Sequence, residues 1–243
     1  MKTHYEEAGD LDSPPLVLIH GAGGSSATWF MQLKGLAKDF HVIAPDLNGH
    51  GKTPDRERGN TLSSYLQDID SIVRQFEKPV LGGHSMGGAL TQLYALAHPN
   101  RLGGIVLVST GARLRCAPFI FHLLDNDFEG YVHAVGEYMF SDSASEELIE
   151  ASQAEVRKCN PSVIKRDFAI CDEFDIMNEI PRILIPALIV VGEDDVMTPL
   201  KYSEYLHDKM PNSRLVVIPG AGHSVMLEQP ALLNVAIKKW YSA

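Results

Sequence analysis

Short apolar runs recur along the chain, each bounded by glycine, proline or polar residues. Runs of this length are typical of parallel strands that are buried on both faces. They predict six strands, at residues 16–20, 41–45, 79–82, 104–109, 187–191 and 214–218. Helical spacing between the runs predicts helices at residues 29–38, 61–76, 87–98, 200–210 and 230–241. This alternation predicts an α/β fold with a mostly parallel, doubly wound sheet, whose ligand lies at the carboxyl ends of the strands.

The segment from residue 113 to residue 181 interrupts this alternation. It contains no strand-like run, and its apolar residues recur at helical spacing over a length that exceeds a simple crossover. The sequence therefore predicts a core of residues 1–112 and 182–243 and a helical cap of residues 113–181. Insertions at the ligand-bearing edge of a sheet often determine specificity. Four side chains of the cap are candidate substrate-binding residues, although packing is the simpler role for each: Phe119, Phe128, Tyr138 and Met139.

The composition fits one domain with an insertion, because the chain has 243 residues and 45% of them are hydrophobic. The formal net charge is −10, and the acidic residues are scattered. This charge disfavours nucleic acid or an anionic membrane as the partner and favours a small uncharged substrate. The N-terminus lacks the apolar run of a secretory signal, and no stretch reaches the ~20 apolar residues of a membrane span. We therefore expect a cytoplasmic protein.

The three cysteines, Cys116, Cys159 and Cys171, are odd in number and show no CxxC spacing. This is not the pattern of a disulfide framework or a zinc site. We expect three free thiols and no metal ion.

A Gly-x-Ser-x-Gly pattern, GHSMG at residues 83–87, lies between a predicted strand and a predicted helix. A serine at a sharp strand-to-helix turn adopts a strained backbone conformation, so the residues two before and two after it must be small. Gly83 and Gly87 meet this requirement. The N-terminal amides of the following helix and its positive dipole end favour an anion at this point. Ser85 is therefore the candidate nucleophile.

The sequence HGAGG at residues 20–24 follows an earlier predicted strand. Glycines at a strand end let the backbone approach a substrate closely. An oxyanion hole at a site of this kind combines the amide of the residue after the nucleophile with an amide of an earlier loop. Met86 and Ala22 are the candidates for these two amides. A plain turn or a nucleotide-phosphate loop is the alternative, but the segment lacks both GxGxxG spacing and the Lys-Ser/Thr pair of a P-loop.

A serine hydroxyl needs a positioned base, and the base needs an orienting carboxylate. His223 is the candidate base, because it lies in a glycine turn after the last predicted strand. His84 abuts the nucleophile but is expected to point elsewhere on the turn. The preceding strand ends in three consecutive acids, Glu193, Asp194 and Asp195, of which one should face the histidine. The chain order of serine, acid and histidine is the one that accompanies a nucleophile elbow.

Five segments together resemble the α/β-hydrolase superfamily over essentially the whole chain: HGAGG, DLNGHG, GHSMGG, GEDDVMTP and GAGH. Within it, the chain is similar to the small capped carboxylesterases. The resemblance implies the α/β-hydrolase fold, with the helical cap inserted after the sixth strand of the family fold. In the family's GxxDxxxP pattern the fourth residue is the triad acid, which selects Asp195 and places Pro199 at the closing proline. Residues 3–8 offer one edge strand where the family has an opening hairpin, so we expect a reduced sheet.

The family hosts several chemistries, so the fold alone does not identify the reaction. Dehalogenases and epoxide hydrolases carry aspartate where this chain has Ser85, and ring-cleavage carbon–carbon hydrolases usually carry asparagine where it has His84. The leading hypothesis is a serine carboxylesterase that cleaves esters of small, mostly apolar substrates through an acyl-enzyme. A carbon–carbon bond hydrolase or lyase with the same triad, or a non-catalytic ligand-binding member of the fold, is the alternative. No cofactor or metal is implied, because Ser85, Asp195 and His223 supply both nucleophile and proton transfer.

Overall fold

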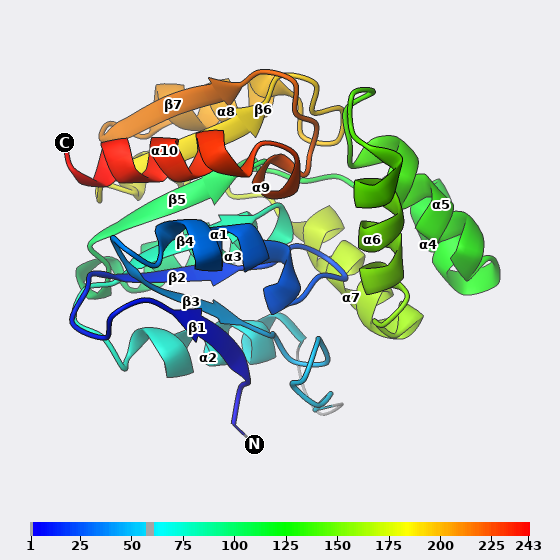
Figure 1. Ribbon diagram of the computed structural model, residues 1–243, viewed down its shortest axis with the longest axis horizontal. Coiled ribbons are helices and arrows are strands. Elements are labelled where there is room, and N and C mark those ends of the chain that lie inside the picture. The colour runs from blue at the N-terminus through cyan, green and yellow to red at the C-terminus, as the bar shows by residue number, and fades with distance from the viewer. Residues whose placement is uncertain (1, 57–60) are drawn as a thin grey trace.

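The computed structural model describes residues 2–56 and 61–243, and within them seven strands form one sheet (Figure 1). The strands are β1 (Tyr5–Ala8), β2 (Pro15–Ile19), β3 (His41–Pro45), β4 (Val80–His84), β5 (Gly104–Val108), β6 (Ala187–Gly192) and β7 (Ser213–Ile218). Their order in the sheet is β1-β3-β2-β4-β5-β6-β7. β1 runs antiparallel to β3, and the other neighbouring pairs are parallel.

Helices cover both faces of the sheet. They are α1 (Phe30–Leu36), α2 (Thr61–Val73), α3 (Met86–Ala97), α4 (Pro118–Asn126), α5 (Phe128–Tyr138), α6 (Glu146–Val156), α7 (Pro161–Glu173), α8 (Leu200–Lys209), α9 (Val225–Glu228) and α10 (Pro230–Tyr241), with short 3-10 helices at Ser26–Trp29, Pro99–Arg101 and Ile180–Arg182. α1, α9 and α10 lie on one face and α2, α3 and α8 on the other (Figure 1). The predicted doubly wound α/β sheet is confirmed. Among the described residues, no helix combines the length and the apolar character that crossing a membrane requires.

The two edges of the sheet differ from its centre in burial. β2 to β6 are almost entirely buried, as expected for strands with helices on both faces. The prediction of a buried strand is wrong for β7, in which Ile218 is the one buried residue and Val217 is 39% exposed. β7 is the last strand of the sheet, so helices and neighbouring strands cover it less completely. At the opposite edge, β1 is the single edge strand expected from residues 3–8.

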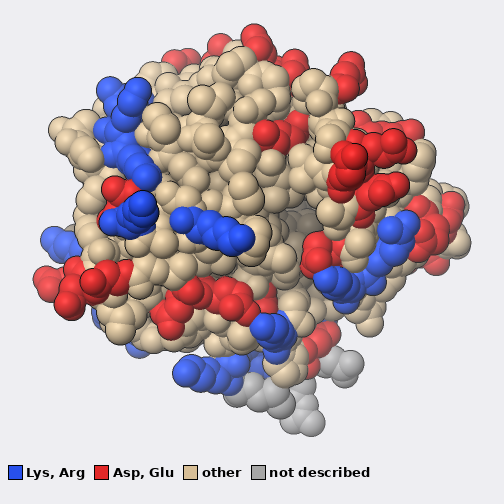
Figure 2. Space-filling view, viewed as in Figure 1, with Lys and Arg blue, Asp and Glu red and all other residues tan. Residues whose placement is uncertain are grey.

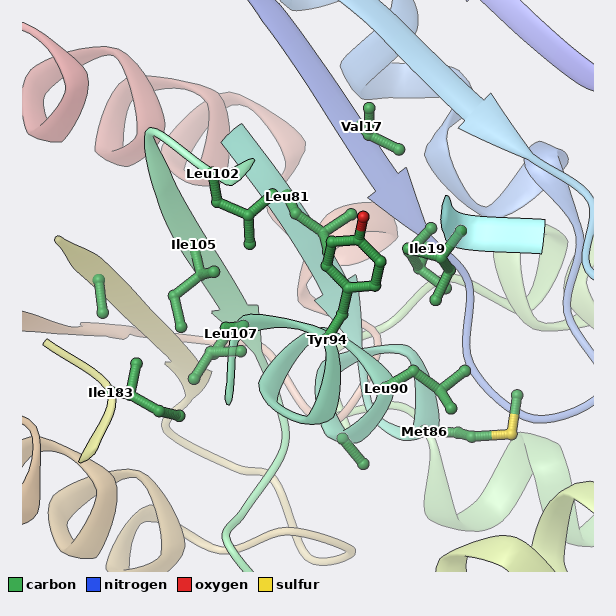
Figure 3. Packing of buried hydrophobic residues seen from close by; sticks show 14 of the residues in the cluster. Val17, Ile19, Leu81, Met86, Leu90, Tyr94, Leu102, Ile105, Leu107 and Ile183 are labelled. Atoms are coloured by element: carbon green, nitrogen blue, oxygen red, sulfur yellow. The ribbon is translucent and has the colours of Figure 1, made fainter. Parts of the chain in front are cut away.

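Helix α3 is anchored on the sheet directly behind the strand that precedes it. Leu90 and Tyr94 of α3 lie in one buried cluster with Leu81 of β4 and Leu107 of β5 (Figure 3). Full burial of one such side chain contributes roughly 1.5–3 kcal/mol to folding. The N-terminus of α3 is therefore held firmly at the carboxyl end of β4.

Between β5 and β6 the chain forms the helices α4 to α7, called here the α4–α7 segment. These helices enclose an apolar cluster separate from those on the two faces of the sheet. The chain enters and leaves the segment side by side, because the N–H of Leu114 donates to the carbonyl of Phe174 (3.2 Å) and that of Ile176 to Ala112 (2.9 Å). The segment lies beyond the carboxyl ends of β4 and β5 (Figure 1). The division of the chain into a core and a cap of residues 113–181 stays a prediction.

Candidate active site

Ser85 links strand β4 to helix α3 with backbone angles φ 52° and ψ −115°. Such a positive φ is rare for a residue with a side chain and costs on the order of 1–3 kcal/mol. A Cβ at Gly83 would lie 2.1 Å from the carbonyl oxygen of Gly87, and a Cβ at Gly87 would lie 2.4 Å from that of Ile19. A side chain at either position would therefore collide with backbone. The turn has the sharp geometry that the sequence motif predicts.

Neighbouring groups hold this strained turn in place. The N–H of Ser85 donates to the carbonyl of Val108 (3.0 Å), and its own carbonyl accepts the hydroxyl of Thr110 (2.8 Å). The next amide, that of Met86, begins α3 and meets no acceptor within the described residues. The amide of Ala22, in the loop after β2, likewise donates to no group in the described part of the chain. Neither predicted oxyanion amide is therefore taken up by another group in the described residues. Ala22 lines the cavity described below, whereas the fully buried Met86 does not.

Asp195 and His223 lie in the loops that follow β6 and β7. Nδ1 of His223 is 3.0 Å from Oδ2 and 3.1 Å from Oδ1 of Asp195. The carboxylate also accepts two backbone amides and the hydroxyl of Thr198 (2.9 Å). Burial opposes ionisation, but His223 and these donors outweigh it and lower the pKa of Asp195 to about 2. Of the three consecutive acids, Glu193 and Asp194 are exposed, and Asp195 is the one that faces the histidine.

The loop that carries His223 is held from two sides. Glu228 accepts the N–H of Gly222 (2.8 Å), and Nε2–H of His84 donates to the carbonyl of His223 (3.0 Å). The ring of His84 is directed to the His223 loop, with its centroid 4.7 Å from that of the His223 ring. Burial, together with the nearby His223, lowers the pKa of His84 well below its usual value. His84 is therefore a neutral support for the loop, a role that its position beside the nucleophile did not reveal.

A cavity of about 1410 Å³ lies between the α4–α7 segment and the sheet, and Ser85, His223 and Ala22 all line it. Nε2 of His223 has no hydrogen-bond partner within the described residues. Side chains of α1 and α6 line the outer part of the cavity, and the face in Figure 2 is hollowed between these helices. Apolar side chains form much of the remaining wall: Tyr131, Val135, Met139, Phe140, Phe168 and Leu227.

The four predicted substrate-binding residues differ in whether they line the cavity. Met139 lines the cavity, and the other three do not. Phe119 and Tyr138 are each 44% exposed and contact one another, with ring centroids 5.9 Å apart. Phe128 stacks on Tyr131 and packs into the apolar cluster of the segment. The rotation of each helix decides which apolar side chain meets the cavity, and helical spacing alone does not fix that rotation.

The cysteines are free thiols, as predicted from their number and spacing. Cys159 is buried, and burial raises the pKa of its thiol to about 12. A thiol of this kind is unreactive at neutral pH. Across residues 2–56 and 61–243, no cluster of three or more His, Cys, Asp or Glu side chains is arranged to hold a metal ion.

Residues 16–236 match the sequence model of the group described as the alpha/beta hydrolase family. The chain belongs to this family. "Putative carbamate hydrolase RutD" from Caulobacter sp. (strain K31) is 29% identical over 247 residues, which cover 95% of this chain and 91% of that protein. An esterase structure from Thermogutta terrifontis has a TM-score of 0.89 and 26% identity, covering 99% and 93% of the two chains. A structure of a thermophilic esterase has a TM-score of 0.85 and 32% identity, covering 99% and 98%.

These matches confirm the predicted superfamily and fold, and they identify the chain as a hydrolase. The sequence interpretation missed one buried polar cluster of this hydrolase. Asp167 of α7 accepts Nε2–H of His50 (2.8 Å), the hydroxyl of Tyr65 (2.5 Å) and the N–H of Gly23 (2.9 Å). Asp167 and His50 are fully buried. The cluster joins α7 to the loop that carries Ala22.

A signal for Asp167 is present in the sequence of α7. The buried residues of this helix are Val163, Ile164, Asp167, Phe168 and Cys171. Their spacing is that of the buried stripe of an amphipathic helix. An acid within such a stripe must meet donors inside the protein, because an unpaired buried carboxylate is costly. The stripe thus marks Asp167 as a buried contact, although it does not name the partners.

Proposed function

We propose that this hydrolase cleaves carboxylic esters of small, mostly apolar substrates through an acyl-enzyme on Ser85. The observation that carries the proposal is the shared cavity, because Ser85 lines it together with a histidine whose Nδ1 is paired with a buried carboxylate. Nucleophilic hydrolysis needs a hydroxyl, a base with a free nitrogen and a group that orients the base. Ser85, His223 and Asp195 supply these three parts.

The proposed reaction begins when Nε2 of His223 takes the proton of the Ser85 hydroxyl and Oγ attacks the ester carbonyl carbon. The amides of Ala22 and Met86 stabilise the oxyanion, and one donor of this kind is worth about 3 kcal/mol. The imidazolium then returns its proton to the leaving alcohol. Water, activated by the same nitrogen, attacks the acyl-enzyme and releases the acid. Asp195 keeps the proton on Nδ1 throughout.

The wall of the cavity favours an apolar acyl group. Phe140, Phe168 and Leu227 offer apolar surface in the cavity that Ser85 also lines. Each buried methylene of an acyl chain gains roughly 0.8 kcal/mol on transfer from water. We therefore expect kcat/KM to rise from acetyl to butyryl p-nitrophenyl esters.

Carbamate hydrolysis is the second candidate, and it is favoured by the name that a relative with 29% identity carries. A carbamate carbonyl would pass through the same tetrahedral oxyanion, so the proposed catalytic groups serve either substrate. Its amino group is polar and would sit against a largely apolar wall. Comparison of p-nitrophenyl butyrate with a p-nitrophenyl carbamate of equal size separates the two, because the leaving group is the same. A higher kcat/KM for the carbamate would favour the second candidate.

The test of the mechanism compares Ser85→Ala with Ser109→Ala. Ser109 follows the neighbouring strand β5 and also has a positive φ of 47°, but it does not line the cavity. We expect Ser85→Ala to lower kcat on p-nitrophenyl butyrate by about 10⁴-fold or more, because it removes the nucleophile. Ser109→Ala should retain activity. A fluorophosphonate should label the wild type and Ser109→Ala but not Ser85→Ala. Undiminished turnover by Ser85→Ala would contradict the mechanism, and a wild type that neither turns over esters nor takes the label would indicate a ligand-binding protein.

A further inference from the structure

Asp167 brings together three parts of the chain that are distant in sequence. It lies on α7, whereas its three donors come from the loop after β2, the loop after β3 and helix α2. Its side chain is completely buried. A buried carboxylate requires several donors, and the three hydrogen bonds meet that requirement. The carboxylate is thus a fixed point that links α7 to the sheet side of the cavity.

The geometry around His50 favours the imidazolium form of its ring. Nε2 faces the carboxylate of Asp167 at 2.8 Å, and Nδ1 faces the carbonyl of Asn48 at 3.2 Å. Both partners are acceptors, so both ring nitrogens carry a proton. Burial disfavours this charge, but the carboxylate of Asp167 outweighs burial and raises the pKa of His50. One positive and one negative charge therefore balance inside the protein.

His20, beside this pair, is neutral. Its Nδ1–H donates to the carbonyl of Gly21 (2.8 Å), and its Nε2 accepts the N–H of Leu47 (3.1 Å). Burial and the neighbouring His50 lower the pKa of His20 to about 4. The charge of the cluster is therefore confined to His50 and Asp167.

Asp167 fixes the loop that supplies a proposed oxyanion amide. The N–H of Gly24 donates to the carbonyl of Gly21 (3.1 Å), which closes a tight turn around Ala22. The next amide after Ala22, that of Gly23, donates to Asp167. Gly23 has φ +66°, a conformation that glycine adopts freely together with many others. A loop of this composition needs an external contact to keep a single conformation.

We propose that Asp167 is a positioning residue, which holds the Gly23 amide so that the neighbouring Ala22 amide points to the oxyanion. The proposal rests on the proposed esterase function. It makes α7 a part of the catalytic arrangement and not only a wall of the cavity. A displacement of about 1 Å at a catalytic group can lower the rate about 100-fold.

A purely structural role is the competing explanation, in which Asp167 only fastens α7 to the rest of the protein. The chain offers a matched control one residue away. Arg166 of α7 pairs with Asp55 at 2.7 Å, so this contact also ties α7 to the core. It does not involve the loop of residues 21–24. Asp55→Asn therefore weakens the anchoring of α7 and leaves the Gly23 amide with its acceptor.

The experiment measures kcat, KM and thermal stability for wild type, Asp167→Ala, Asp167→Asn and Asp55→Asn with p-nitrophenyl butyrate. We expect Asp167→Ala to lower kcat about 100-fold, with KM within about twofold, because the loss is confined to the transition state. Asp167→Asn keeps the shape and one acceptor oxygen, so it should lower kcat about 10-fold. The asparagine variant also tests the proposal if Asp167→Ala does not fold. Asp55→Asn should change kcat by less than about twofold.

The affinity for a transition-state analogue is a measurement that a purely structural role of Asp167 would not affect. A trifluoromethyl pentyl ketone forms a tetrahedral oxyanion with the nucleophile, so its affinity should fall by the same factor as kcat/KM in the Asp167 variants. Folded Asp167 variants that keep wild-type kcat and inhibitor affinity would overturn the positioning role alone. Equal losses of kcat in Asp55→Asn and Asp167→Asn would do the same. A wild type without ester turnover would overturn this role together with the proposed function.

Discussion

Two buried carboxylate–histidine pairs flank the cavity region. They differ in whether the second ring nitrogen of the histidine has a hydrogen-bond partner. The Asp195–His223 pair has an N–O distance of 3.0 Å, and the Asp167–His50 pair one of 2.8 Å. His223 uses Nδ1 for its carboxylate and lines the cavity that Ser85 also lines. His50 has acceptors at both nitrogens, and neither it nor Asp167 lines the cavity. The same two residue types therefore form the proposed base in one place and the proposed backbone support in the other.

The contrast teaches that a carboxylate partner does not by itself make a histidine a base. A general base needs a nitrogen without a proton within reach of the substrate. Nε2 of His223 has no hydrogen-bond partner in the described residues, so it is free to take the proton of the Ser85 hydroxyl in the proposed mechanism. His50 already carries protons on both nitrogens, and Asp167 holds one of them. The two histidines differ mainly in whether the second ring nitrogen is free, and much less in their burial or in their distance from the carboxylate.

The aspartate of each pair can be replaced by asparagine. The largest expected effect is the loss of activity when this change is made at Asp195. We expect Asp195→Asn to lower kcat on p-nitrophenyl butyrate about 10⁴-fold, because an amide no longer holds the proton on Nδ1 of His223. The matching change, Asp167→Asn, should cost only about 10-fold, because its histidine takes no part in proton transfer. Steady-state kinetics of the two variants measures both. Similar losses in the two variants would contradict the division of roles.

A smaller effect is expected in the stability of the protein at acid pH. The folded-state pKa of Asp195 is lowered to about 2, below the ~3.9 of an unfolded aspartate. The stabilisation from Asp195 is therefore present above the unfolded-state pKa and is lost as the pH falls through the folded-state pKa. Between about pH 5 and about pH 3, the free energy of unfolding should fall by about 1 kcal/mol more in wild type than in Asp195→Asn. Urea denaturation at both pH values measures this difference, and parallel curves would contradict it.

The sequence predicted those contacts of the candidate site that depend on short segments. The turn at Ser85 requires small residues two positions away on either side, and Asp195 and His223, which lie 3.0 Å apart, follow successive strands of the sheet. The hydrogen bond from Gly23 to Asp167 joins residues 144 positions apart, and no local spacing encodes such a contact. The pocket side chains were predicted poorly for a related reason. Phe119 and Met139 have similar helical surroundings in the sequence, and only the packing of the helices turns Met139 to the cavity.

The smallest expected effect is in stability at alkaline pH, and its sign is opposite. The pKa of His50 is raised, since Asp167 outweighs the effect of burial. This stabilisation is therefore fully present below the unfolded histidine pKa of ~6.5 and is lost as the pH rises through the folded value. His50→Gln keeps a donor for Asp167 but does not titrate. The advantage of wild type over His50→Gln should therefore shrink from about pH 6 to about pH 9 in urea denaturation. An advantage that is constant with pH would show that the pKa of His50 is the same in the folded and the unfolded protein, which would remove the charge balance from the comparison of the two pairs.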